Sequence, residues 1–201
     1  LSTNASDRRI IQLTSIGNQY IIAVTPTIFM PEFLPVVDKN DKVLRYLPSK
    51  LIHAQELRHR EIVVYLIDAT GKILVQKRDG GYFDHSVAGH VRKGESYLQA
   101  ALREVKEEVD LTLTARDLKC LGKFYHRTLS PQKGYHNDRF FTLYVVKYPV
   151  ALSVLHINKH ELENLKPLSI QPIKTIMRKN PKKCKGGFLV SFPLLLKYHR
   201  L

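Results

Sequence analysis

The feature that most constrains this chain is a predicted helix with three glutamates on one face. Ser96 and Gln99 have the spacing of a capping box, which marks a helix start. The glutamates follow at positions i, i+3 and i+4 and therefore share one side of the helix; they are Glu104, Glu107 and Glu108. Carboxylates at this spacing repel one another by roughly a few tenths of a kcal/mol per pair. Because hard cations prefer oxygen ligands, this face predicts a site for a divalent cation.

The other side of the same helix is apolar and predicts packing against a sheet. Its members are Leu98, Ala101, Leu102 and Val105. The helix is expected to run to about Val109, with Asp110 at its exit. A helix end favours glycine because glycine tolerates the left-handed conformation, which Asp adopts less readily. The segment thus predicts an amphipathic helix with a core face and an acidic face that is free to bind a cation.

Residues before the glutamates extend the pattern to Gly-x5-Glu-x7-Arg-Glu-x2-Glu-Glu, which resembles the Nudix box. Six positions carry the resemblance: Gly89, Glu95, Arg103, Glu104, Glu107 and Glu108. Val105 and Leu111 fill its aliphatic positions, whereas Asp110 stands where the family usually has glycine. A solvated helix face would also contain glutamates. Six matches within twenty-three residues favour the Nudix interpretation over that alternative.

The resemblance implies an α/β fold, a Nudix-type α/β/α sandwich with a mixed sheet, and a pyrophosphatase activity that depends on Mg²⁺ or Mn²⁺. The implied metal ligands are the carbonyl of Gly89 and the side chains of Glu95, Glu104, Glu107 and Glu108. The cation would neutralise a diphosphate and help to activate a water molecule for attack on phosphorus. Among the catalytic residues, Arg103 would orient the glutamates by charge-assisted hydrogen bonds, and Glu104 or Glu108 would act as general base.

Segments outside the box resemble the Nudix branch that contains isopentenyl-diphosphate isomerase; they are residues 37–43, 72–78 and 84–90. That enzyme binds a metal through histidines and glutamates, and it uses a cysteine just before a Gly-His pair. Here the cysteine position holds Ala88, which cannot transfer a proton. The resemblance therefore implies the fold of this branch without its isomerase chemistry.

The same resemblance leaves a second metal site open. His59 and His90 stand at places that match histidines of the isomerase, and His53 lies one residue out of register with a third. His136 and Asp138 lie near the place of its paired glutamates. Surface or hydrogen-bonded histidines would explain these residues as well, because no pairwise spacing among them is specific for a metal.

The net charge of +14 favours anionic partners. Lys77 and Arg78 end a predicted strand near the box and are candidates for binding substrate phosphates, although solvated strand-end charges explain them equally well. A phosphorylated small molecule is the expected substrate, and the charge leaves nucleic acid open as a partner. A group of late cations is expected to form a solvated surface. These cations are Lys174, Arg178, Lys179, Lys182, Lys183 and Lys185.

A length of 201 residues predicts an N-terminal extension over residues 1–33, whose strand pattern predicts a hairpin, and a Nudix domain over residues 34–201. No apolar run reaches the roughly 20 residues of a membrane span, and no secretory signal pattern opens the sequence. Cys120 and Cys184 lack metal-binding spacing and indicate a reducing compartment, so a cytoplasmic protein is expected. Whether the hairpin forms a homodimer is left open.

Strand and turn signals predict the remaining elements. The expected strand pairs are 9–14 with 20–25, 36–37 with 43–44, and 62–67 with 72–76, followed by strands at 118–125 and 139–147. Helices are expected at 49–57 and 173–179, and Gly186-Gly187 is expected to break the chain before an apolar segment at 188–198. Strands mixed with helices predict a sheet that is covered on both faces.

Three functions follow from these observations. The leading hypothesis is a metal-dependent hydrolase that cleaves a diphosphate linkage in a nucleotide-like or other phosphorylated substrate. The second is a non-catalytic Nudix module that binds RNA or a nucleotide, which the positive charge supports and the retained glutamates oppose. The third is an isomerase that uses other groups, which Ala88 opposes.

Overall fold

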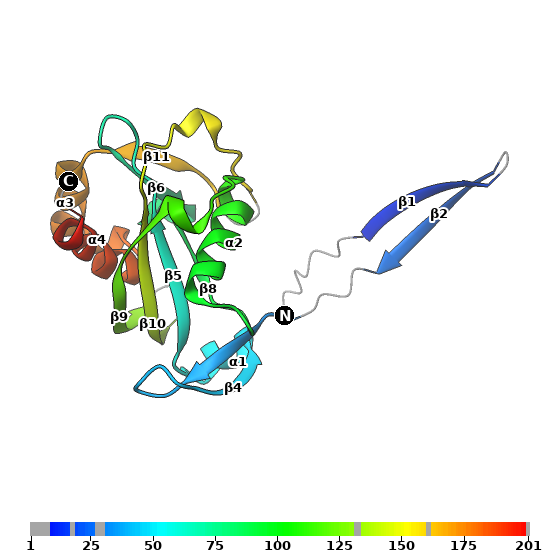
Figure 1. Ribbon diagram of the computed structural model, residues 1–201, viewed down its shortest axis with the longest axis horizontal. Coiled ribbons are helices and arrows are strands. Elements are labelled where there is room, and N and C mark those ends of the chain that lie inside the picture. The colour runs from blue at the N-terminus through cyan, green and yellow to red at the C-terminus, as the bar shows by residue number, and fades with distance from the viewer. Residues whose placement is uncertain (1–8, 17–18, 27–30, 131–133, 160–161, 200–201) are drawn as a thin grey trace. The chain divides into compact units, whose positions relative to one another are not determined.

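The computed structural model describes residues 9–16, 19–26, 31–130, 134–159 and 162–199. The chain divides into two compact units, Leu1–Pro31 and Glu32–Leu201. In the first unit, β1 (Arg9–Ile16) pairs antiparallel with β2 (Gln19–Pro26), as the sequence predicts (Figure 1). Positions 17 and 18 of the expected turn lie outside the described residues.

The second unit holds the other helices and strands of the described chain. Its strands are β3 (Phe33–Val37), β4 (Val43–Pro48), β5 (His59–Tyr65), β6 (Ile73–Arg78), β7 (Tyr82–Asp84), β8 (Val87–His90), β9 (Leu118–Ser130), β10 (Tyr135–Val146) and β11 (Leu165–Leu168). Its α-helices are α1 (Ser49–Ala54), α2 (Tyr97–Val109), α3 (Ile170–Lys179) and α4 (Gly186–Tyr198).

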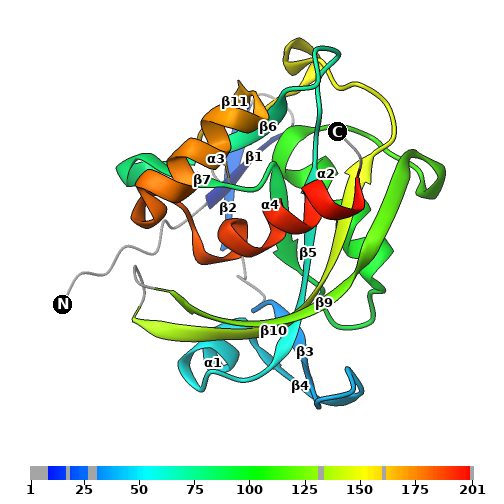
Figure 2. The ribbon, with the colours of Figure 1, turned by 90° about the vertical axis from the view of Figure 1, so that its left-hand side faces the viewer.

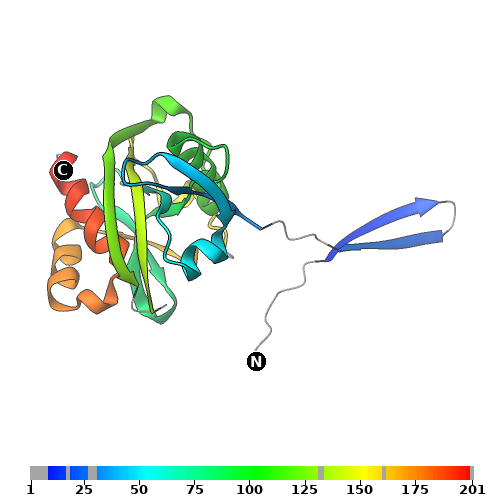
Figure 3. The same cartoon turned by 90° about the horizontal axis from the view of Figure 1, so that it is seen from below.

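A four-stranded mixed sheet in the order β8-β5-β10-β9 forms the centre of this unit. β5 and β10 run parallel, whereas β8 and β9 run antiparallel to their neighbours. Two smaller antiparallel sheets, β11-β6-β7 and β3-β4, complete it. Helix α2 lies on one side of the central sheet and α3 and α4 lie on the other (Figures 1 and 3), and α4 crosses in front of the sheet in Figure 2. The predicted α/β/α sandwich with a mixed sheet is therefore confirmed.

Two hydrophobic cores lie on the two faces of the central sheet. Along β5, Ile62 and Val64 pack into the core on the α2 side, whereas Val63 and Tyr65 pack into the core on the α4 side. A strand that is buried on both faces has a nearly continuous apolar sequence, as residues 62–65 of this strand do. Each fully buried large apolar side chain stabilises the fold by about 1.5–3 kcal/mol. These two cores fix α2 and α4 against opposite faces of the same strand.

The predicted pairing of residues 62–67 with 72–76 is correct only at the turn. Asp68 accepts a hydrogen bond from the N–H of Gly71 at 3.0 Å, and Leu74 donates to the carbonyl of Leu66 at 2.9 Å. Beyond the turn, β5 pairs with β8 and β10, and β6 pairs with β7 and β11. Because both edges of β5 are occupied by other strands, β6 joins a different sheet.

The predicted break at Gly186-Gly187 is wrong, because these two glycines form the first turn of α4. A Cβ atom on Gly186 would lie 2.7 Å from Cγ2 of Thr128, so glycine allows the helix start to approach β9 closely. Two other helices differ from prediction at one end: α1 ends at Ala54, and α3 begins at Ile170. Within the described part of the chain, no helix has both the length and the apolar character to cross a membrane.

Candidate functional site

Helix α2 begins and ends as its sequence predicts. The Ser96 Oγ accepts a hydrogen bond from the N–H of Gln99 at 3.3 Å, and the Gln99 side chain accepts from the N–H of Ser96 at 2.9 Å. A capping pair of this kind stabilises a helix by about 1 kcal/mol. At the other end, Asp110 adopts the left-handed conformation with φ of 56°. The Asp that departs from the family pattern therefore still ends the helix in the usual way.

Arg103 connects the acidic side chains of the box. Its Nε donates to Glu95 at 2.6 Å, and its Nη1 donates to Glu104 at 2.7 Å and to Glu107 at 2.9 Å. Its Nη2 donates to the backbone carbonyl of His90 at 2.9 Å. Burial lowers the pKa of Arg103, but the surrounding carboxylates outweigh it and raise the pKa above its ordinary value. This is the geometry that an orienting residue needs, and its part in a reaction remains a prediction.

Two of the three glutamates on α2 are buried, which differs from the free acidic face expected from the sequence. Glu104 and Glu108 are each only 6% exposed. Burial raises the pKa of Glu104. Glu108 accepts a hydrogen bond from Gln76 at 3.4 Å, and Glu107 accepts two from Arg92, both at 3.1 Å. The acidic face is thus enclosed by polar donors, which hold the carboxylates together against their mutual repulsion.

Gly89 lies against the cluster of Glu104, Glu107 and Glu108, which we call the acidic centre. A Cβ atom at position 89 would lie 2.1 Å from the Cδ of Glu104, so any other residue here would displace the Glu104 carboxylate. The Glu104 carboxylate therefore lies directly against the backbone of β8. Several carboxylates beside a backbone segment form the all-oxygen donor set that Mg²⁺ and Mn²⁺ prefer. The oxygen atoms of these residue types suit such a cation.

Glu95 takes a different place from the other box glutamates. Both of its oxygens accept hydrogen bonds from Arg103, at 2.6 and 2.9 Å, and one also accepts from the backbone N–H of Arg92 at 2.8 Å. The sequence predicts Glu95 among the metal ligands. In the structure its contacts are with the arginine that holds the other glutamates.

A carboxylate far from the box in sequence also joins the centre. Glu32 accepts hydrogen bonds from His90 at 3.1 Å and from Arg92 at 3.0 Å. Burial raises the pKa of Glu32, but these two partners outweigh it and lower the pKa to about 2. Glu32 and Gln76 were not predicted as site residues, since neither belongs to a local pattern.

Three of the histidines considered for a second metal site lie together. His53 on α1, His59 on β5 and His90 on β8 bring ring nitrogens within 4.8 Å of one another. His53 and His90 are joined through their Nε2 atoms at 3.1 Å, so a hydrogen-bonded structural role also accounts for the pair. Burial lowers the pKa of His90, but Glu32 and Glu61 outweigh it and raise the pKa.

His136 and Asp138 do not belong to this histidine cluster. The backbone N–H of His136 donates to Glu56 at 3.1 Å, and Asp138 pairs with Arg58 at 2.8 Å. The sequence places these two residues near the ligand positions of the isomerase branch. The structure gives each a different partner.

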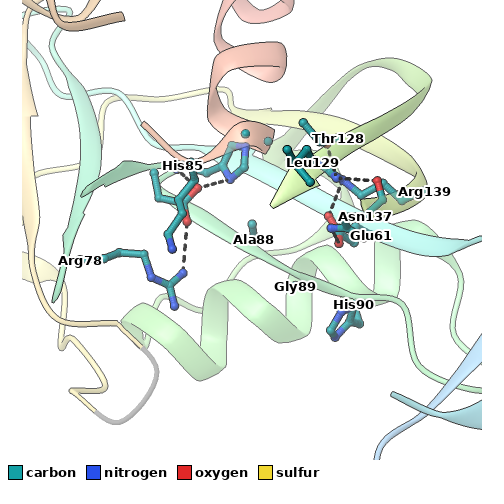
Figure 4. A pocket seen from close by; sticks show the side chains of 14 residues that line it. Glu61, Arg78, His85, Ala88, Gly89, His90, Thr128, Leu129, Asn137 and Arg139 are labelled. Atoms are coloured by element: carbon teal, nitrogen blue, oxygen red, sulfur yellow. Dashed lines mark hydrogen bonds and ion pairs between the residues drawn. The ribbon is translucent and has the colours of Figure 1, made fainter. Parts of the chain in front are cut away.

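A cavity of about 240 Å³ opens beside Gly89 (Figure 4). In this view His85 and Arg78 lie to the left, Glu61, Asn137 and Arg139 lie to the right, and Ala88 and Gly89 lie between them, with the start of α4 above and α2 below. Arg78 lines the cavity and pairs with Asp84 at 3.2 Å. Lys77, the other predicted phosphate-binding residue, is exposed and is not part of the lining. The structure therefore separates the two basic residues that the sequence places side by side.

The far side of the cavity carries a buried ion pair. Arg139 on β10 lies 2.7 Å from Glu61 on β5. Burial raises the pKa of Glu61, but the charge of Arg139 outweighs it and holds the pKa well below its ordinary value. Asn137 donates to the other Glu61 oxygen at 2.8 Å. The cavity is thus lined by ionised groups near the sheet and by the N-terminus of α4.

Two known proteins are similar to this chain in sequence over part of their length. An uncharacterized Nudix hydrolase of Yersinia pestis is 36% identical over 86 residues, which are 40% of this chain and 47% of that protein. An isopentenyl-diphosphate Delta-isomerase of Serratia proteamaculans is 31% identical over 108 residues, which are 51% of this chain and 59% of that protein. The matches therefore span about half the length of these two relatives.

Solved structures share the fold. The crystal structure of DR0079 from Deinococcus radiodurans superposes with a TM-score of 0.64 at 21% identity, over 84% of this chain and 100% of that chain. The NUDIX domain of NrtR from Shewanella oneidensis, in a complex with ADP ribose, gives a TM-score of 0.51 at 12% identity, over 69% and 86% of the two chains. The family model described as NUDIX domain matches residues 57–184, more than half of the chain. The protein belongs to the Nudix family.

Proposed function

We propose that this protein is a metal-dependent Nudix hydrolase that cleaves a diphosphate linkage in a nucleotide-like or other phosphorylated substrate. The observation that carries the proposal is the enclosed acidic centre, in which Glu104 lies against Gly89 and Arg103 connects the box glutamates. Nudix family membership supports hydrolysis. The complex of the Shewanella oneidensis NUDIX domain with ADP ribose is an example of a diphosphate ligand on this fold.

The metal that we propose is Mg²⁺ or Mn²⁺, held by Glu104, Glu107 and Glu108 with the backbone of Gly89. When bound, it would supply positive charge for the diphosphate and lower the pKa of a coordinated water molecule. Glu95 accepts hydrogen bonds from Arg103 through both oxygens, so it would help to position the metal ligands through that arginine.

The remaining steps belong to the protein's own side chains. Glu104 and Glu108 are the two buried carboxylates that are candidates for accepting the proton of the attacking water. Arg103 keeps the carboxylates in place. Arg78, at the wall of the cavity beside Gly89, is placed to bind a substrate phosphate.

A panel of diphosphate-linked compounds, assayed with Mg²⁺ and with Mn²⁺, tests the proposal. We expect release of a phosphorylated product from at least one compound, lost in Glu107→Gln and kept in Glu163→Gln, a matched change at an exposed glutamate outside the centre. The absence of turnover from every compound with either metal would contradict a hydrolase.

The basic surface motivates a second candidate, a Nudix module that binds RNA or a nucleotide without cleaving it. The net charge of +14 is the observation that favours it. Salt-dependent RNA binding by a variant that lacks all three α2 glutamates would support this alternative. RNA binding that is absent even at low salt would eliminate it.

Isomerase relatives motivate a third candidate. Ala88 lines the cavity, and its methyl group cannot give or accept a proton. We therefore expect no isotope exchange from solvent into isopentenyl diphosphate. Exchange above the level of a metal-only control would overturn this expectation.

A further inference from the structure

The cavity beside Gly89 ends at the N-terminus of α4, a helix of 13 residues. No side chain caps this end, and the first intrahelical hydrogen bond runs from the N–H of Leu189 to the carbonyl of Lys185 at 3.1 Å. The N–H groups of the first turn therefore have no acceptor within the helix. Such groups, together with the helix dipole, attract anions.

A buried histidine lies beside this helix end. The His85 side chain is 7% exposed; its Nδ1 lies 2.9 Å from Oδ1 of Asp84, whereas its Nε2 makes no hydrogen bond with the described residues. Its ring lies beside the start of α4 in Figure 4. Asn137 also lines this cavity, and its buried side-chain oxygen has no hydrogen-bond partner among the described residues. Because buried polar atoms are normally satisfied, their gathering at one cavity indicates a polar occupant.

Gly187 keeps this end of the cavity open. A Cβ atom at position 187 would lie 2.7 Å from Nη2 of Arg139, 3.0 Å from Cε1 of His85 and 3.5 Å from its Nε2. Any side chain here would fill the space between the helix start and these two residues. Glycine is otherwise a poor residue for a helix.

The charge around the cavity favours an anion. Two carboxylates line it, but each is matched by an arginine: Asp84 by Arg78 at 3.2 Å, and Glu61 by Arg139 at 2.7 Å. Lys185, at the start of α4, adds a third positive charge to the lining. The cations thus exceed the carboxylates by one, before the helix dipole is counted.

We propose that the α4 end of the cavity, formed by the N–H groups of Gly186 and Gly187 with His85 and Lys185, binds a second phosphate group of the substrate. This inference rests on the proposed hydrolase function and deepens it. The scissile diphosphate lies at the acidic centre, and a phosphate on the other side of Gly89 lies at the α4 end. The substrate class is therefore a compound with phosphate groups beyond the metal-bound one.

An adjoining groove is suited to the rest of such a substrate. It encloses about 640 Å³ and shares Thr128, Leu129 and Gly186 with the cavity. Tyr82 and Leu189 contribute to its more apolar lining. A cavity of about 240 Å³ is small for a whole nucleotide, since ligand pockets are typically about 300–1,000 Å³.

A titration of the full chain with inorganic phosphate, with EDTA present and amide NMR as the readout, tests the site without turnover. We expect saturable shifts of the Gly186 and Gly187 amides. In Gly187→Ala and in His85→Ala, phosphate should bind at least about tenfold more weakly. Lys197→Ala, which removes the same charge as Lys185→Ala from the opposite end of α4, should bind as the unaltered chain does. Unmoved glycine amides, or equal affinity in Gly187→Ala and His85→Ala, would overturn the proposal.

A kinetic measurement separates this proposal from the hydrolase function. With a substrate that carries the additional phosphate, Lys185→Ala should raise KM about tenfold and change kcat less than twofold. An unchanged KM would contradict the subsite. Glu108→Gln should lose turnover and still show the phosphate titration, so loss of hydrolysis and loss of the subsite give different results.

Discussion

The acidic centre and the histidine cluster are neighbouring groups of side chains of the types that bind metals, and they form in different ways. The three glutamates of the first come from one helix, where positions i, i+3 and i+4 determine their meeting. The histidines of the second come from α1, β5 and β8, and only the packing of these elements brings them together. A helix can therefore encode a site locally, whereas a site built across strands depends on register.

The two groups also differ in how their charge is balanced. Arg103 and Arg92 form charge-assisted hydrogen bonds with the acidic centre. The histidine cluster is held by the contact between His53 and His90 and by the bond from His90 to Glu32. We propose that hydrolysis takes place at the first group and requires no metal at the second.

The largest effect is expected when a buried carboxylate of the acidic centre is neutralised. Glu108→Gln retains the shape of the side chain and its contact with Gln76 but removes the charge. We expect kcat to fall about 1,000-fold, equivalent to about 4 kcal/mol of transition-state stabilisation. Steady-state kinetics checks this, with circular dichroism as the control for folding. A decrease of less than fivefold would assign the reaction to other residues.

A smaller loss of activity is expected when Gly89, which lies against the acidic centre, is replaced. In Gly89→Ala, the new Cβ would lie 2.1 Å from the Cδ of Glu104, so that side chain must move. We expect kcat to fall about 100-fold, because misplacement by about 1 Å is enough for such a loss. The Glu104→Ala change in the Gly89→Ala background should add little. Independent, multiplicative losses would show that the two residues do not act together.

The histidine cluster should matter much less for hydrolysis. We expect His53→Ala to leave kcat within about threefold and to lower the free energy of unfolding by about 1–2 kcal/mol, since it removes the partner of His90. Activity assays and urea unfolding measure the two effects. A 100-fold loss of activity with an unchanged free energy of unfolding would place the cluster in the catalytic machinery.

The smallest effect is expected at the helix start. Ser96→Ala removes the hydroxyl that caps α2. We expect it to lower the free energy of unfolding by about 1 kcal/mol and to change kcat less than twofold. Urea unfolding provides the measurement, and Ser153→Ala, at an exposed serine outside α2, provides the control.

The elements that could be predicted are those whose signals are local. The capping pair, the glutamate spacing and the αL exit at Asp110 all lie within one segment, and the structure contains each of them. The strand pairs of β1 with β2 and of β3 with β4 are also local.

The remainder depends on contacts between distant segments. Glu32 directly precedes β3, Gln76 lies on β6 and His85 directly follows β7. The packing of these strands brings the three residues to the site, and no spacing in the sequence reports this. The turn at residues 68–71 predicts that β5 and β6 approach each other, but it contains no information about β10, which pairs with β5 instead. Gly186-Gly187 has the composition of a break, and the close approach of Gly186 to Thr128 of β9 explains why glycine stands at this helix start.

The most direct test of the central claim is a Mn²⁺ titration that follows metal binding by electron paramagnetic resonance and substrate turnover in the same samples. Two double variants are compared: one combines Glu107→Gln and Glu108→Gln, and the other combines His53→Ala and His59→Ala. We expect the first pair of changes to abolish both the tight Mn²⁺ binding and the turnover that depends on it, and the second pair to preserve both. Turnover that survives in the glutamate variant and disappears in the histidine variant would contradict the account.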